Sequence, residues 1–187
     1  MNHDETALAR RLKRLIAANE QLLHDLEAVK SLRLPQCFIA AGYIRNMVWD
    51  HLSGCDYRSL HDDIDVVYYD REHCSEERDL LLEQELRVRT GNDKWSVKNQ
   101  ARMHIRNGTA PYLSTADALM QWPETVTSIG ARLNDDHVLE LCHPNGLSDL
   151  FRMEVRRSPY FEDRSYYLER IRKKNWQELW PKLTIYE

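Results

Sequence analysis

Two aspartates on one predicted strand are the residues whose type and spacing best suit chemistry. Asp63 and Asp65 belong to the run DDIDVVYYD, and the β-branched and aromatic residues of 64–69 predict a strand. Alternate residues of a strand share a face, so the two carboxylates point the same way with their Cα atoms roughly 7 Å apart. Because paired carboxylates repel each other without a cation between them, we predict that Asp63 and Asp65 are catalytic and hold Mg²⁺ or Mn²⁺. The alternative is a solvated pair at the end of a strand.

A glycine at a predicted strand-to-helix junction precedes this strand. Gly42 follows the apolar run 37–41, and the apolar spacing of 43–52 predicts a helix. A glycine there lets the backbone approach a ligand, and the amide groups of a helix N-terminus attract anions. Arg45 lies one turn into that helix, where its guanidinium is placed to bind a phosphate. Taken singly, Gly42 suits close packing and Arg45 suits a surface ion pair. Followed by an aspartate pair, they indicate metal-dependent transfer of a nucleotidyl group.

The run KNQARMH, residues 98–104, is unusually polar for a junction between a strand and a helix. One interpretation makes it a second wall of the same pocket, with Lys98 near phosphates and with Asn99 and His104 in contact with the substrate. The other interpretation makes Asn99 a helix cap and His104 a hydrogen-bonded, half-buried residue. The sequence leaves both interpretations open.

The remaining pattern predicts long helices at both ends of the chain around a strand-rich middle. Apolar spacing and capping residues predict helices over 4–30, 43–52, 75–89, 99–106, a short segment after Ser114, and 166–180. Strands are expected over 37–41, 64–69, 94–98, 128–133 and 137–142, the last two as a hairpin, with a loop over 53–62. This order favours an α+β fold in which helices flank a mixed β-sheet.

Length and composition are those of one domain. The 187 residues are 42% hydrophobic and carry a formal net charge of −4. We expect a single domain over 1–187, in which a helical extension (1–34) precedes a core (35–150) and a helical segment (151–187) follows it. No apolar run approaches the roughly 20 residues of a membrane span, and charges occupy the start of the chain, so we expect a cytoplasmic protein without a membrane partner. The negative net charge does not favour nucleic acid as a partner.

The chain resembles a known superfamily along most of its length. Residues 39–46, IAAGYIRN, followed by the Asp-Ile-Asp strand, resemble the polymerase-β-type nucleotidyltransferases, and GYIRN is similar to the tRNA nucleotidyltransferase form of that motif. The runs AGYIRNMVWDHL, DDIDVVYYD, WSVKNQARMH and GLSDLF resemble a bacterial nucleotidyltransferase-like family over about 36–180. The resemblance implies a mixed sheet flanked by helices, Mg²⁺, a nucleoside triphosphate and an unknown acceptor. It also implies nucleotide-binding positions at Gly42, Tyr43 and Arg45.

Two features depart from the superfamily pattern. Tyr43 stands where the pattern has a second glycine or serine. A third carboxylate is expected on a later strand, and in WSVKNQ its place is taken by Ser96, Lys98 or Asn99. Glu140, on the second strand of the predicted hairpin, is the candidate substitute. A two-metal site needs such a carboxylate, because one of the ions otherwise loses a ligand.

Three functions remain open on the sequence. The first is Mg²⁺-dependent transfer of a nucleoside monophosphate from a nucleoside triphosphate to an acceptor. The second is a nucleotide-binding module of the same fold without catalysis. The third is an RNA-associated protein that uses the basic and aromatic residues of 152–180, whose simpler interpretation is a solvated helix face over an aromatic core edge.

Overall fold

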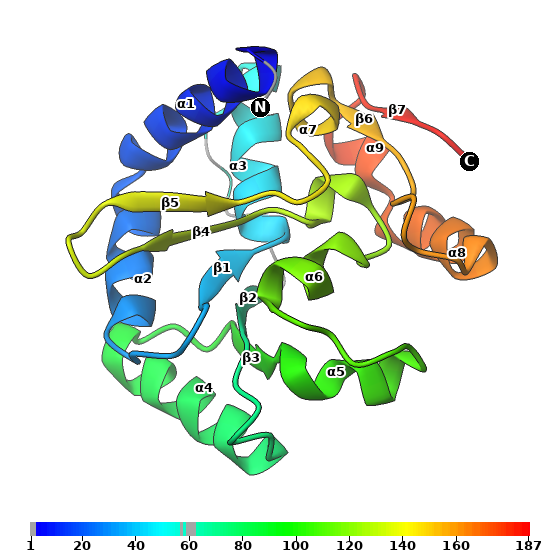
Figure 1. Cartoon of the computed structure of the whole chain (residues 1–187). Coiled ribbons are helices and arrows are strands. Elements are labelled where there is room, and N and C mark those ends of the chain that lie inside the picture. The colour runs from blue at the N-terminus through cyan, green and yellow to red at the C-terminus, as the bar shows by residue number, and fades with distance from the viewer. Residues whose placement is uncertain (1–2, 57, 59–62) are drawn as a thin grey trace.

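A five-stranded mixed sheet forms the centre of the protein (Figure 1). The computed structural model describes residues 3–56, 58 and 63–187. The strands follow the order β3-β2-β1-β4-β5, in which β2 and β3 are parallel and every other neighbouring pair is antiparallel. The strands are β1 Phe38–Ala40, β2 Ile64–Tyr68, β3 Trp95–Asn99, β4 Gly130–Leu133 and β5 Leu139–Cys142. The predicted α+β fold with a mixed sheet flanked by helices is confirmed.

Helices surround this sheet, and a second, two-stranded sheet lies near the C-terminus (Figure 1). The helices are α1 His3–Ala17, α2 Glu20–Lys30, α3 Gly42–Ser53, α4 Glu76–Thr90, α5 Gln100–Asn107, α6 Thr115–Met120, the 3₁₀ turn η1 Thr125–Thr127, α7 Ser148–Arg152, α8 Arg164–Lys174 and α9 Trp176–Leu179. The small sheet pairs β6 Glu154–Val155 with β7 Thr184–Ile185 in parallel. In the part of the chain that the structure describes, no helix combines the length and apolar character needed to cross a bilayer.

The main hydrophobic core lies on one face of the sheet. Alternate strand residues point into it, among them Ile39, Val66 and Val97, and α3 contributes Trp49, whose residue surface is 0% exposed. A smaller cluster on the other face contains Phe38, Ala40, Val67 and Leu119 of α6. Because successive strand residues point to opposite faces, Asp65 lies on the face of the smaller cluster.

Both terminal segments differ from the single long helices that the sequence predicts. Asn19 separates α1 from α2, because its side chain accepts a hydrogen bond from the Leu22 N–H at 2.9 Å and caps α2. Asn175 adopts a left-handed backbone with φ of 47° and separates α8 from α9. Both breaks occur at asparagine, whose short side chain bonds locally and tolerates left-handed angles. The pairing of β6 with β7 was not predicted.

Local signals elsewhere in the chain are confirmed. The hydroxyls of Ser75 and Ser114 cap α4 and α6 by accepting the N–H groups of Arg78 and Asp117. The strands β4 and β5 form the predicted hairpin. The predicted loop 53–62 lies partly outside the described residues, at 57 and 59–62.

Candidate active site

Asp65 lies between two small neighbours in the sheet. Antiparallel pairing sets it opposite Ala40 of β1, and parallel pairing sets it beside Ser96 of β3. Neither neighbour has a side chain long enough to cover the carboxylate, and Asp63, at the entry to β2, is exposed. The strand before Gly42 and the strand of the aspartates are therefore neighbours in one sheet. The register with Ala40 brings Gly42 to the same end of the sheet as the two carboxylates.

The turn between β1 and α3 contains one strained residue, Ala41. Its φ of 56° and ψ of −123° are angles that glycine adopts readily and other residues rarely do. The Ala41 N–H donates to the Ile129 carbonyl at 3.1 Å, and the Ala41 carbonyl accepts the Arg45 N–H at 3.0 Å, so α3 begins at Gly42. The position that demands a small residue beside Gly42 is therefore Ala41. The sequence analysis wrongly assigned this position to Tyr43, on the other side of Gly42.

Replacing Ala41 with glycine is expected to stabilise the protein by about 1 kcal/mol, because relief of backbone strain outweighs the added entropy of the unfolded chain. The measurement is the free energy of unfolding in urea at pH 7. The matched control is Ala40→Gly, one residue earlier in regular, fully buried strand, which is expected to destabilise by about 1 kcal/mol. Equal destabilisation by both changes would contradict strain at Ala41.

Tyr43 is a core residue. Its surface is 1% exposed, and its hydroxyl donates to Asp25 Oδ2 on α2 at 2.7 Å. Asp25 is itself buried and also accepts a hydrogen bond from Gln21 at 3.1 Å. The Tyr43 side chain thus joins α3 to α2, on the side of the helix that packs into the core. We therefore do not retain its side chain as a nucleotide contact.

Arg45 is buried beside two tryptophans. It is 6% exposed, and its Nε and Nη2 both donate to Asn46 Oδ1, at 3.1 and 2.8 Å. Its guanidinium carbon lies 4.4 Å from the centre of the Trp176 ring and 5.1 Å from that of Trp49. Burial lowers the pKa of Arg45 to about 10, which leaves it charged at neutral pH. Arg45 is therefore neither an exposed phosphate-binding group nor part of a surface ion pair, but a fixed positive charge within the protein.

The charge of Asp65 is unfavourable in the folded protein. Burial raises the pKa of its carboxyl to about 7, and the Asp63 carboxylate adds to the rise. Arg170, Arg45 and Lys174 act in the opposite direction without cancelling it. A divalent cation bound to both aspartates favours the ionised form and removes their repulsion. The electrostatics of the pair therefore suit a cation site.

Helix α8 contributes positive charge near the aspartates, which the sequence did not predict. Arg170 and Lys174 are one helical turn apart, and the positive charge of each opposes the rise in the pKa of Asp65. Glu124, which is 0% exposed, holds Arg170 by accepting its Nε–H at 2.6 Å. The available signal was the i, i+4 spacing of two cations within the basic segment 151–187. Only the fold brings the charges of that segment close enough to act on Asp65.

Asn99 has a structural role. It is fully buried, caps α5 by accepting the Ala101 N–H, and donates to the carbonyls of Asp70 and His73 in the loop after β2. It pairs with Tyr68, three residues along β2 from the second aspartate, or roughly 10 Å. The capping interpretation of Asn99 is confirmed.

The other two candidate residues of the polar run, Lys98 and His104, also have partners within the protein. The Lys98 ammonium lies 2.8 Å from Glu83 of α4. His104 is half-buried, its Nδ1 lies 2.9 Å from the Ala101 carbonyl, and its ring lies edge-on to Tyr112. These contacts hold α5 and β3 against their neighbours. They do not support the interpretation in which Lys98 and His104 form a second wall of a pocket at the aspartates.

Glu140 does not supply the third carboxylate. It lies on β5, three strands away from β2 in the sheet. There it opposes Arg132 of β4 and forms an ion pair with it at 2.6 Å. Among the described residues, no three or more His, Cys, Asp or Glu side chains are grouped so as to hold a metal ion.

A mixed sheet that places a carboxylate pair beside a strand–turn–helix unit defines the polymerase-β type of nucleotidyltransferase fold. A family model described as nucleotidyltransferase matches residues 27–185. A solved structure, described as an NMR structure that reveals a CCA-adding enzyme head domain, is 36% identical with a TM-score of 0.84, over 95% of this chain and 95% of that chain. The chain belongs to this nucleotidyltransferase family.

Two larger structures share the fold at low identity. A CCA-adding enzyme in complex with CTP is 14% identical with a TM-score of 0.58, over 94% of this chain and 43% of that chain. The Thermotoga maritima CCA-adding enzyme complexed with tRNA is 15% identical with a TM-score of 0.56, over 94% and 42%. The chain thus spans less than half the length of these two enzymes. No curated protein matches it.

Proposed function

We propose that the protein is a Mg²⁺-dependent nucleotidyltransferase that moves a nucleoside monophosphate from a nucleoside triphosphate to an acceptor hydroxyl or phosphate. The observation that carries this proposal is the register between Ala40 and Asp65, which sets the carboxylate pair beside the N-terminus of α3. Amide groups at a helix N-terminus bind phosphate, and the carboxylates bind the cation that accompanies a triphosphate.

In the proposed reaction an acceptor oxygen attacks the α-phosphorus of the triphosphate, and the bond to the pyrophosphate oxygen breaks. Asp63 and Asp65 would hold Mg²⁺, which when bound would offset negative charge on the phosphate oxygens. The backbone at Gly42 binds the β- and γ-phosphates. Arg170 and Lys174 offset the remaining negative charge from the side of α8. Arg45 steadies the ionised aspartates from within the protein.

The larger structures that share the fold guide the choice of nucleotide and acceptor. The similar structures that contain CTP and tRNA are those of enzymes more than twice as long as this chain. CTP is therefore the first nucleotide to test, and tRNA is one acceptor among others. The net charge of −4 favours an acceptor held by the site over one held by a broad basic surface.

The test combines ligand binding with turnover. The melting temperature is measured with Mg²⁺ and each of ATP, CTP, GTP and UTP, and pyrophosphate release is measured with and without tRNA. At least one nucleotide is expected to raise the melting temperature. Asp63→Asn and Asp65→Asn are each expected to abolish that shift and to lower pyrophosphate release by about 10²-fold or more. Asp136→Asn, at an exposed carboxylate on the β4–β5 hairpin, is the control and should behave as the parent.

Two outcomes bear against the proposal in different ways. If no nucleotide shifts the melting temperature of the parent, or if both aspartate variants keep the shift, the site does not bind nucleotide through these carboxylates. If the shift occurs without pyrophosphate release under any condition, the second candidate holds, a nucleotide-binding module without catalysis. That candidate is favoured by one observation, the lack of a third acidic ligand among the described residues.

A further inference from the structure

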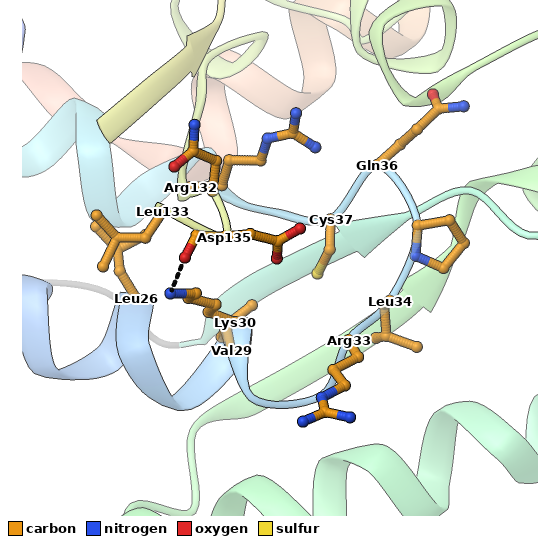
Figure 2. Close-up of a pocket in the computed structure, with 12 residues that line it drawn as sticks. Leu26, Val29, Lys30, Arg33, Leu34, Gln36, Cys37, Arg132, Leu133 and Asp135 are labelled. Atoms are coloured by element: carbon orange, nitrogen blue, oxygen red, sulfur yellow. Dashed lines mark hydrogen bonds between the residues drawn. The ribbon is translucent and has the colours of Figure 1, made fainter. Parts of the chain in front are cut away.

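A cavity lies away from the aspartates, at the beginning of β1 (Figure 2). Its volume is about 520 Å³, within the usual range for sites that take small molecules. The end of α2, the segment 33–37 and the β4–β5 hairpin form its walls. The aspartate pair lies beside the opposite end of β1, next to Ala40. A ligand in this cavity would therefore not occupy the proposed nucleotide site.

Positive charge dominates the lining. Lys30, Arg33 and Arg132 line the cavity, and Asp135 is the one acidic residue among the lining residues. Arg132 is partly neutralised, because it pairs with Glu140 at 2.6 Å. Lys30 donates only to the main-chain carbonyl of Asp135, at 3.3 Å, and within the described residues neither Lys30 nor Arg33 has a carboxylate partner. Two cations at one cavity thus lack a carboxylate counter-ion from the part of the chain that the structure describes.

The end of α2 does not cancel this charge. The last carbonyls of a helix carry partial negative charge when they lack partners. Here the carbonyls of Glu27, Val29 and Lys30 accept the N–H groups of residues 31–33. They are therefore satisfied within the protein, and the cavity keeps its positive character.

The rest of the lining is aliphatic. Leu26 and Val29 of α2, Leu34 and Leu133 supply apolar surface, and none of the lining residues is aromatic. A nucleobase gains much of its binding energy by stacking on an aromatic ring, so this lining does not suit one. The Cys37 thiol is buried, and burial raises its pKa to about 12, so it is a neutral group and not a nucleophile. The chemistry of the cavity is binding, not reaction.

We infer that this cavity binds a small aliphatic anion, whose carboxylate or phosphate contacts Lys30 and Arg33 and whose body packs on Leu26, Val29 and Leu133. The negative charge of Asp135 repels such an anion. Figure 2 shows its carboxylate on the side of the Cys37 thiol, within the ring of lining residues. Removing the positive charge of Arg33 is therefore expected to weaken binding, and removing the negative charge of Asp135 is expected to tighten it.

The probes are hexanoate and hexyl phosphate, with hexanol as the uncharged comparison, and binding is measured by NMR titration of the full chain. Both anions are expected to bind more tightly than hexanol, and the better of the two identifies the anionic group. Arg33→Gln is expected to weaken binding about tenfold, and Asp135→Asn to tighten it about threefold. The matched controls are Arg106→Gln on α5 and Asp136→Asn beside Asp135, both exposed and outside the lining, and both should bind as the parent.

The location of the shifted amide signals makes the result decisive. Amide signals of 30–34, 36–37 and 133–135 are expected to move, while those of Gly42 and Asp65 stay in place. Equal binding of hexanol and the anions, unchanged affinity in Arg33→Gln, or shifts confined to the aspartate site would each overturn the inference. None of these results depends on nucleotide binding, so this inference and the proposed function can fail independently.

Discussion

Asp65→Asn is expected to make the protein more stable than the parent at pH 8 in EDTA, by about 2–4 kcal/mol, and to change little at pH 4. The pKa of Asp65 rises from an ordinary value of 3.8 to about 7 on folding, because the partly buried carboxyl is desolvated and is repelled by the charge of Asp63. The folded state therefore binds more protons than the unfolded state between these values. The stability that this group contributes is present below about pH 4 and is lost as the pH rises to about 7. Asparagine does not titrate, so the variant escapes that loss.

The measurement is the free energy of unfolding of parent and variant in urea, at intervals from pH 4 to pH 8. The difference between the two is expected to widen through this range and to level off above pH 7. Addition of Mg²⁺ at pH 8 should stabilise the parent and not Asp65→Asn, since the cation binds the ionised pair. A constant deficit of the variant at every pH would instead show that the Asp65 carboxylate is a structural hydrogen-bond acceptor.

Glu124→Gln is expected to destabilise the protein by about 3 kcal/mol, the largest loss of stability that we expect from a single change of charge. Glu124 is 0% exposed and accepts hydrogen bonds from Arg170 at 2.6 Å and from the Thr127 hydroxyl at 3.0 Å. Its charge also acts on the buried Arg45. Glutamine keeps the size of the side chain but leaves two cations without their counter-charge, so the desolvation of those cations is no longer offset.

Glu140→Gln is the matched control for Glu124→Gln. Its ion pair with Arg132 has a similar length, 2.6 Å, but both side chains are more than a third exposed, at 38% and 36%. Solvent screens that pair, so the change is expected to cost less than about 1 kcal/mol. The double variant Glu124→Gln/Arg170→Gln should recover part of the lost stability, because it removes one of the uncompensated charges. Equal losses at Glu124 and Glu140, or no recovery in the double variant, would contradict a buried charge network.

Much of the secondary structure was predictable, because its cause is local. Ser75 and Ser114 cap helices through N–H groups three residues away, and the apolar runs around Val66 and Ile39 form strands. The breaks at Asn19 and Asn175 also have local causes, but helical spacing continues across both and conceals them. The sequence therefore indicated that the terminal segments are helical without revealing that each is two helices.

The roles of single polar side chains were less predictable, because their partners are distant in sequence. In the sequence, Tyr43 appears beside Gly42 in a ligand-binding turn. In the structure, its hydroxyl donates a hydrogen bond to Asp25 of α2. Arg45 looks like an exposed phosphate ligand until Trp176, more than a hundred residues later, covers it. Burial and hydrogen bonding decide what a charged or polar group can do, and both depend on the packing of remote segments.

The sequence by itself predicted that Asp63 and Asp65 share a face and determined that a small-residue turn leads from a strand into a helix, since strand alternation and helix initiation follow from a few consecutive residues. Only the tertiary structure decided that this turn and the aspartates meet at one end of the sheet, through the pairing of Ala40 with Asp65. It likewise brought Arg170 toward the pair and set Glu140 three strands away. Strand order and helix docking arise from contacts between residues far apart in the chain, and local residue patterns do not encode which of those contacts form.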